Sequence, residues 1–104
     1  MEISKQDWEL YRRKMPVWQE NYMERLCKEY TEILTSDVQS SDSFWKLWER
    51  IKGDRKSTGV IARMSRSSVI FNLVDLIREG AITLVDLAEF SEQVQERVRF
   101  LAER

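Results

Sequence analysis

The sequence lacks histidine altogether, and among its 104 residues it has one cysteine, one proline and three glycines. Without histidine the chain has neither the commonest general base near neutral pH nor the commonest zinc ligand. Cys27 by itself can form neither an internal disulfide nor a structural zinc site, and we expect it to be a structural residue. Gly53, Gly59 and Gly80 do not have the spacing of a nucleotide-binding loop. These absences predict a protein that is not an enzyme and that holds no cofactor and no metal.

Long apolar runs are missing as well. The longest, over residues 69–77, is interrupted by Asn72 and Asp75 and falls far short of the roughly 20 residues that span a bilayer. The N-terminus has no signal-peptide pattern. We therefore expect a cytoplasmic protein without a membrane segment. A chain of this length with 42% hydrophobic and 34% charged residues is expected to fold as one domain over residues 1–104.

Apolar residues recur at helical spacing along most of the chain. The first stripe runs from Trp8 to Ile33 in steps of three or four residues, which predicts a long N-terminal helix. Ser4 is expected to cap this helix, with Asp7 as the acidic partner of the cap. Pro16 interrupts the backbone hydrogen bonding within the stripe. Because the stripe keeps its phase across Pro16, we predict one helix that is kinked there.

A second helix is predicted after a polar linker over residues 35–43. The linker is rich in side chains that compete for backbone hydrogen bonds. Ser41 or Asp42 is expected to cap the helix, and Gly53 marks where it weakens.

The aromatic residues of this second helix predict both a core face and an exposed anchor. Phe44, Trp48 and Ile51 are spaced as one helical face. We expect Trp48 to lie in the core, as we do Trp18 of the first helix. Trp45 is one step off this line, and we expect it to be partly exposed.

A third helix is expected to form the centre of the core. Ser65 or Ser67 should begin it, Glu79 should end it, and Gly80 should follow in the left-handed conformation that ends many helices. Apolar side chains cover most of its circumference between residues 69 and 77, which is typical of a buried helix.

Two further helices are predicted near the C-terminus. Thr83, with Asp86 three residues later, has the pattern of a helix cap, and Ser91 can begin a last helix. No stretch alternates between apolar and polar residues with a period of two. The sequence therefore predicts an all-α fold, a small compact bundle of four or five helices.

The net charge of −1 hides a local imbalance. Residues 50–66 carry a net +5, so the rest of the chain carries a net −6. A segregated surface of this kind can steer a charged partner, nucleic acid included, although basic runs are also typical of solvated loops. Trp and Arg are enriched at binding hot spots. The candidate binding residues are therefore Trp45 as an anchor and the basic side chains Arg50, Lys52, Arg55, Lys56, Arg63 and Arg66.

Two short motifs follow one another in and around the third predicted helix: the segment Ile61-Ala62-Arg63-Met64-Ser65-Arg66-Ser67-Ser68-Val69, and then Leu73, Leu76, Glu79, Gly80 and Ile82. They resemble the opening and closing motifs of the recognition helix in winged helix-turn-helix transcription regulators. The resemblance covers about 22 residues and implies that Arg63, Arg66, Ser67 and Ser68 would face DNA.

A second resemblance covers most of the chain and rests on the segments 44–47, 70–73, 81–87 and 90–91, with the basic stretch through Gly59. In these the chain resembles small uncharacterised proteins of Gram-positive mobile elements. Some compact proteins of that setting are type II-A anti-CRISPR proteins, which inhibit the RNA-guided nuclease Cas9. The resemblance implies a mobile-element inhibitor, without a functional motif that can be transferred residue by residue.

The acidic part of the chain suits this resemblance, because a nuclease that holds RNA and DNA in positively charged channels presents a target for carboxylates. The candidate acidic binding residues are Asp86, Glu89, Glu92 and Glu96. Such side chains are also typical of the first turns and solvent faces of ordinary helices.

Three classes of function follow from these patterns. The first is a non-catalytic binding protein that inhibits a macromolecular target, in its sharpest form Cas9 or its guide RNA complex. The alternative is a DNA-binding transcriptional regulator that uses a degenerate helix-turn-helix. The third is an assembly protein that pairs with its own copy as a homodimer through the aromatic stripe of the N-terminal helix.

Overall fold

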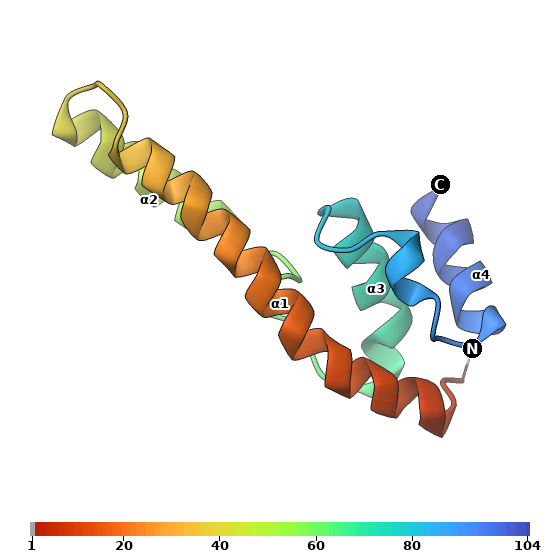
Figure 1. Cartoon of the computed structure of the whole chain (residues 1–104). Helices are drawn as coiled ribbons and strands as arrows, with labels where there is room; N and C mark the ends of the chain where they lie inside the picture. Colours follow the sequence, from red (N-terminus) through yellow and green to blue (C-terminus); the bar gives the residue numbers. More distant parts are fainter. Residues whose placement is uncertain (1) are drawn as a thin grey trace.

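The computed structural model describes residues 2–104, and its regular elements are helices. The α-helices are α1 (Lys5–Leu34), α2 (Ser40–Asp54), α3 (Val69–Arg78) and α4 (Glu92–Ala102), and the short 3₁₀ helices η1 (Arg66–Ser68) and η2 (Leu84–Leu87) precede α3 and α4 (Figure 1). No strand occurs in this described part of the chain, so the predicted all-α fold is confirmed. None of the helices over residues 2–104 is both long and apolar enough to cross a membrane.

Helix α1 is the predicted long N-terminal helix. Ser4 caps it, because the Ser4 Oγ accepts a hydrogen bond from the Asp7 backbone N–H at 3.1 Å. Pro16 lies inside the helix, where it removes one backbone hydrogen bond. The ribbon bends in this N-terminal part but continues without a break (Figure 1). The expected single helix through Pro16 is confirmed.

The aromatic stripe of α1 is covered by the rest of the chain. Trp8 stacks on Tyr11, with 6.0 Å between the ring centroids, and Trp18 packs against Phe90 at 6.3 Å. Trp18 therefore packs against the core, as predicted. The fully or almost fully buried members of the stripe are Tyr11, Met15, Tyr22, Leu26 and Ile33. Trp8, Trp18 and Tyr30 of the stripe remain half-buried.

The core lies where α3 and α4 pack side by side against the N-terminal half of α1 (Figure 1). Val69, Leu73 and Leu76 of α3 are fully buried, together with Val94 and Val98 of α4. The expected central position of α3 is confirmed. One of its apolar residues departs from this pattern, because Phe71 lies on the solvent side of the helix and is 66% exposed.

The ends of the C-terminal helices follow their local sequence signals. Gly80 has a φ of 77°, the left-handed conformation that a residue with a Cβ rarely adopts. Thr83 and Asp86 form a capping box at η2, and the Ser91 Oγ accepts a hydrogen bond from Val94 N–H at the start of α4. These three features were predicted from the sequence.

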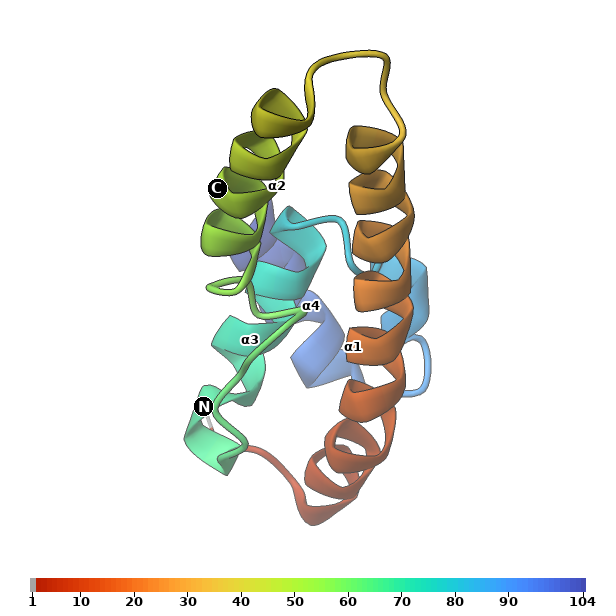
Figure 2. The ribbon, with the colours of Figure 1, turned by 90° about the vertical axis from the view of Figure 1, so that its left-hand side faces the viewer.

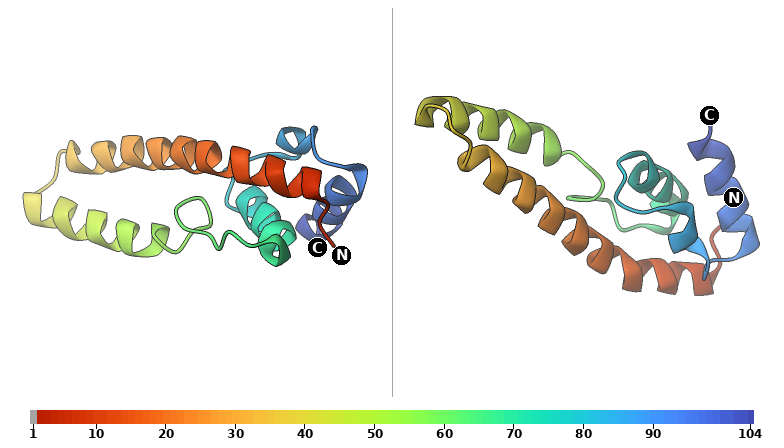
Figure 3. Two further views of the ribbon diagram at one scale, coloured as in Figure 1. Left: turned by 90° about the horizontal axis from the view of Figure 1, so that it is seen from below. Right: turned by 45° about the horizontal axis from the view of Figure 1, so that its top comes forward.

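The C-terminal half of α1 and the antiparallel α2 form a hairpin that extends beyond the core (Figures 2 and 3). The molecule measures 52 × 26 × 20 Å and has a Cα radius of gyration of 16.2 Å. A compact domain of this length would have a radius of gyration of about 13 Å. Residues 2–104 are thus more extended than the expected compact bundle, because the tip of the hairpin lies beyond α3 and α4.

The loop after α2 joins the hairpin to the core. The Glu79 carboxylate accepts hydrogen bonds from the backbone N–H groups of Thr58, at 2.9 Å, and Gly59, at 3.0 Å. The Gln19 side chain donates to the Thr58 carbonyl at 3.0 Å. This loop is therefore fixed both to α1 and to the end of α3, and it sets the position of the hairpin base.

Candidate protein-binding interface

Several polar contacts join the two helices of the hairpin along their seam. Tyr30 of α1 donates a hydrogen bond to the Asp54 carboxylate at 2.6 Å, and Arg50 of α2 lies 3.4 Å from Glu29 and 3.5 Å from Asp54. Ser43 is the buried residue of α2. Burial raises the pKa of Tyr30, and the hydrogen bond to Asp54 raises it further. The Tyr30 phenol therefore stays protonated and keeps its role as donor in the seam.

Because polar residues of α2 form the seam, its aromatic residues face solvent. Phe44 is 62% exposed, Trp45 60%, Trp48 50% and Ile51 39%. The expected exposure of Trp45 is confirmed. The expectation that Phe44, Trp48 and Ile51 form a core face is wrong, because this face is turned roughly a quarter of a turn around α2 from Ser43, Arg50 and Asp54.

Helix α1 adds apolar residues beside this aromatic face. Met23, Cys27 and Tyr30 line an apolar groove of about 210 Å³ with Ile51 of α2 and Val60 of the following loop. Leu34, two turns after Cys27, is 57% exposed. We call the combined surface the hairpin face; it consists of Met23, Cys27 and Leu34 of α1 and Phe44, Trp45, Trp48 and Ile51 of α2.

Cys27 was expected to be a structural residue, but its thiol is free and exposed. It lies in the groove of the hairpin face rather than in the core. Its position in sequence, between the buried Leu26 and the exposed Lys28, gave no indication of this, because α2 determines which part of α1 is covered.

The opposite side of the hairpin is charged. A depression there is lined by Glu29 and Glu32 of α1 and by Lys46 and Arg50 of α2. The hairpin thus has one apolar and one charged side. A two-sided helical pair of this kind is typical of an element that binds a partner through its apolar side.

The predicted basic residues do not behave as one group. Arg50 is held in the seam, and the Arg66 guanidinium donates to the Ile3 carbonyl at 2.6 Å. Arg66 is nonetheless exposed, as are Lys52, Arg55 and Lys56 at the C-terminal end of α2 and Arg63 in the loop before η1. Segment 50–66 therefore includes cations that hold the fold together as well as cations free to meet a partner.

Two of the predicted acidic residues have local partners. Asp86 belongs to the capping box of η2. Glu89 lies 2.7 Å from Lys14, and the hydrogen bond from Lys14 lowers the pKa of the Glu89 carboxyl. Asp86 and Glu89 are thus engaged by their own chain.

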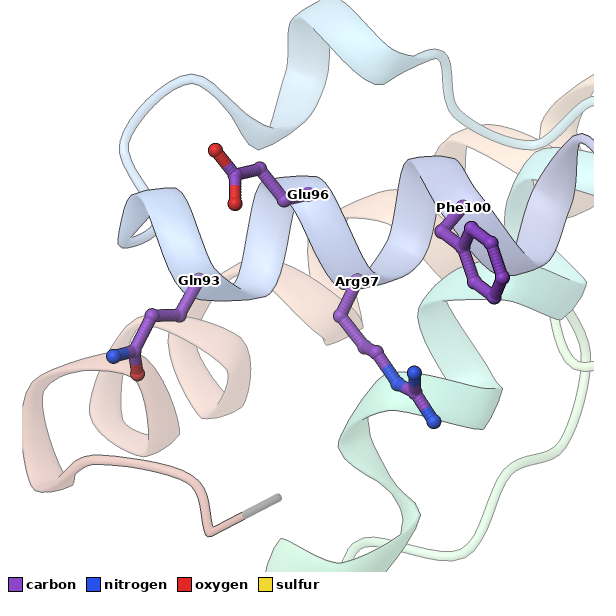
Figure 4. Close-up of a pocket in the computed structure, with 4 residues that line it drawn as sticks. All are labelled: Gln93, Glu96, Arg97 and Phe100. Carbon is purple, nitrogen blue, oxygen red and sulfur yellow. The ribbon is translucent and has the colours of Figure 1, made fainter.

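The other two, Glu92 and Glu96, lie on the exposed surface of α4. Glu96 borders an open depression of about 460 Å³ with Gln93, Arg97 and Phe100 (Figure 4). The Glu96 and Arg97 side chains extend from opposite sides of the helix (Figure 4). This depression therefore does not bring together a paired acid and base.

Over residues 2–104 no group of three or more cysteine, aspartate or glutamate side chains is arranged to hold a metal ion. Comparisons of the chain with protein-family models, with curated proteins and with solved structures find no significant match.

Replacing Trp45 and Trp48 together by glutamine is expected to change the free energy of unfolding by no more than about 1 kcal/mol. Both side chains are at least half exposed, and exposed substitutions away from special contacts have small effects. Urea unfolding followed by circular dichroism measures this. A loss of several kcal/mol would mean that the two rings pack into the fold.

Proposed function

We propose that this protein is a non-catalytic binding protein that inhibits a macromolecular target, and that the hairpin face is its contact surface. The proposal is carried by one observation: three large aromatic side chains, Phe44, Trp45 and Trp48, lie exposed on one helix that projects from the core. Exposed apolar patches mark interaction sites, and Trp is enriched among the residues that dominate binding free energies.

The sharpest form of the proposal takes the RNA-guided nuclease Cas9 as the target. It is supported by the resemblance to small mobile-element proteins. A stoichiometric inhibitor needs a rigid surface and no reactive group. Exposed carboxylates such as Glu92 and Glu96 would add attraction to the positively charged channels of such a nuclease.

The test is cleavage of a linear DNA target by a type II-A Cas9 loaded with guide RNA, at increasing molar ratios of the protein. We expect cleavage to stop near a one-to-one ratio. The Trp45→Gln/Trp48→Gln variant should need at least tenfold more protein. The matched control is Phe71→Gln on α3, which removes an exposed aromatic outside the hairpin face and should inhibit like the parent.

Two results would contradict this assignment. Full cleavage at a hundredfold excess of the protein would remove Cas9 as the target. Inhibition that survives the double tryptophan substitution would place the contact elsewhere on the molecule.

The alternative of a DNA-binding regulator rests on the exposed Arg63 and on the cations at the end of α2. A regulator of this kind should bind free duplex DNA with an affinity that falls steeply as salt rises, and Arg63→Ala should reduce the slope by about one. Fluorescence anisotropy with labelled duplex measures this. The Cas9 proposal expects no binding of free DNA at physiological salt.

A further inference from the structure

The hairpin face points away from the core. Where α1 passes from the core into the hairpin, Trp18 packs on Phe90, Tyr22 lies against Gly59, and Arg25 donates to the Gly80 carbonyl. At 3.6 residues per turn, Met23 and Cys27 are displaced from Tyr22 by about 100° and 140° around the helix. Figure 2 views the hairpin with the core behind it. A large partner can therefore approach the hairpin face without meeting the core.

The two edges of the hairpin face carry opposite charges. The exposed Glu20 and Glu24 follow Cys27 around α1, on the side away from α2. The exposed Lys52 follows Trp48 around α2, and Arg55 lines the groove at the base. Tyr30 contacts Asp54 and Glu29 contacts Arg50 across the antiparallel pair, so Glu24 lies near the level of Arg55 along the hairpin. Glu20 lies about one turn nearer the base, and Lys52 about one turn nearer the tip.

We propose that a second copy of this chain covers the hairpin face, through a two-fold axis parallel to the long axis of the hairpin. This axis places α1 of one copy over α2 of the other and forms a four-helix arrangement. Glu24 of each copy then opposes Arg55 of the other, with Glu20 and Lys52 about one turn away on the same two edges, so the charge match is made twice. Isologous pairing of this kind is the commonest form of protein dimer.

The charges also select this orientation. In the reverse orientation the tip of one hairpin lies over the base of the other, and Glu20 and Glu24 would face the region of Thr31 and Thr35, where Lys28 is the one nearby cation of the described residues. Glu24 forms an exposed ion pair with Lys28 of its own chain, at 3.5 Å. In the proposed orientation this ion pair is replaced by contacts of Glu24 to the second copy. Exposed pairs of this type contribute little by themselves, so the exchange costs little.

The available area fits a reversible dimer. The exposed parts of Phe44, Trp45, Trp48 and Ile51 amount to on the order of 400 Å² of apolar surface, since a large aromatic side chain buries about 150–250 Å². The 15 residues of α2 make the face about 22 Å long. Together with the contribution of α1, each copy approaches the roughly 800 Å² of a standard interface. We expect dissociation in the micromolar range.

This inference rests on the proposed function in one respect: both assign the hairpin face as an interaction surface. Without a target, the dimer covers the aromatic residues of the hairpin face. A target then competes with the second copy for binding to this face. At nanomolar concentration the dimer dissociates and leaves the face open.

The experiment is sedimentation velocity of the purified full chain between about 1 and 100 μM, without any target. The expected mass rises from 12.5 kDa toward twice that value. Glu20→Lys/Glu24→Lys should weaken association at least tenfold, as should Lys52→Glu/Arg55→Glu. The variant that combines all four substitutions should regain dimerisation, because the two edges of the hairpin face again carry opposite charges.

The matched control is Glu9→Lys/Glu32→Lys, which makes the same charge change away from the hairpin face and should dimerise like the parent.

A monomer at every concentration would overturn the inference. So would a dimer that Glu20→Lys/Glu24→Lys leaves unchanged, or a combined variant that stays monomeric. The cleavage assay at about 10 nM separates the two proposals. If the protein dimerises but does not inhibit Cas9, the proposed target fails and the dimer stands; if it inhibits without dimerising, the opposite holds.

Discussion

Replacing Gly59 with alanine is expected to destabilise the protein by about 2–3 kcal/mol, because the added methyl group would occupy the space of a buried ring. A Cβ at this position would lie 2.7 Å from Cγ and 2.8 Å from Cε2 of Tyr22. The Tyr22 ring is buried, and the Arg25 guanidinium lies 5.1 Å from its centroid. Overpacking of this kind costs about 1–3 kcal/mol.

The loop cannot easily move away from Tyr22, because Glu79 holds the backbone N–H groups of both Thr58 and Gly59. The matched control is Gly53→Ala, where nothing lies within 4 Å of the new Cβ. Alanine inside a helix is more favourable than glycine by about 0.5–1 kcal/mol, so this variant should be slightly more stable. Thermal and urea unfolding of both variants measure the difference. Equal stability of the two would show that the close approach of Gly59 to Tyr22 is not a constraint.

Replacing Asp7 with alanine is expected to lower the free energy of unfolding by about 3 kcal/mol. Asp7 is buried, and its carboxylate accepts hydrogen bonds from the Ser91 backbone N–H at 3.0 Å and the Ser91 hydroxyl at 2.7 Å. It also accepts from the Ser4 hydroxyl at 3.1 Å. Hydrogen bonds to charged groups contribute about 1.5–3 kcal/mol each, and both donors of Ser91 would lose their carboxylate partner.

The control for this substitution is Asp86→Ala, which removes a carboxylate from an exposed cap. That cap lies on the surface at η2, and loss of such a cap costs about 1 kcal/mol. Asp7→Asn should fall between the two, because one acceptor oxygen remains. Chemical denaturation of the three variants measures the order of their free energies of unfolding. If Asp7→Ala costs no more than Asp86→Ala, the link between the starts of α1 and α4 contributes nothing to stability.

Most features predicted correctly from the sequence were those that neighbouring residues determine. The cap of α2 is an exception, because the helix begins at Ser40 after Gln39, and the predicted caps Ser41 and Asp42 lie inside it. Ser4, Thr83 and Ser91 cap helices because their side chains reach backbone groups within three residues, and Gly80 ends α3 because of its own backbone conformation. The long stripe of α1 predicted a buried helix correctly, since its period was kept for seven turns.

The errors have a different physical origin. Burial of α2 depends on which of its sides meets α1, and the seam of Tyr30, Asp54 and Arg50 with Glu29 joins residues 21 to 24 positions apart. An apolar period therefore predicted the aromatic face of α2 but not whether that face is covered. The sequence did contain a signal for the polar seam. Ser43, Arg50 and Asp54 also recur at helical spacing, so the polar side of α2 could equally be expected to face α1.

The roles of Asp7 and Arg66 were missed for the same reason. Asp7 meets Ser91 and Arg66 meets the Ile3 carbonyl across 84 and 63 positions of sequence. Asp7 was predicted only as part of a local cap, and Arg66 only as a contact to a partner. Both contacts exist only once the chain has folded.

The projection of the hairpin has a consequence for how the molecule opens in solution. Its tip, around Leu34 and Val38, is exposed and lies far from the core. Regions with few buried contacts open locally without global unfolding. Backbone amides at the tip can therefore exchange with solvent while the amides of α3 remain protected. A molecule that binds the hairpin face raises the free energy of this local opening by its own binding free energy. The exchange rate of the tip amides therefore reports how much of the hairpin face is occupied.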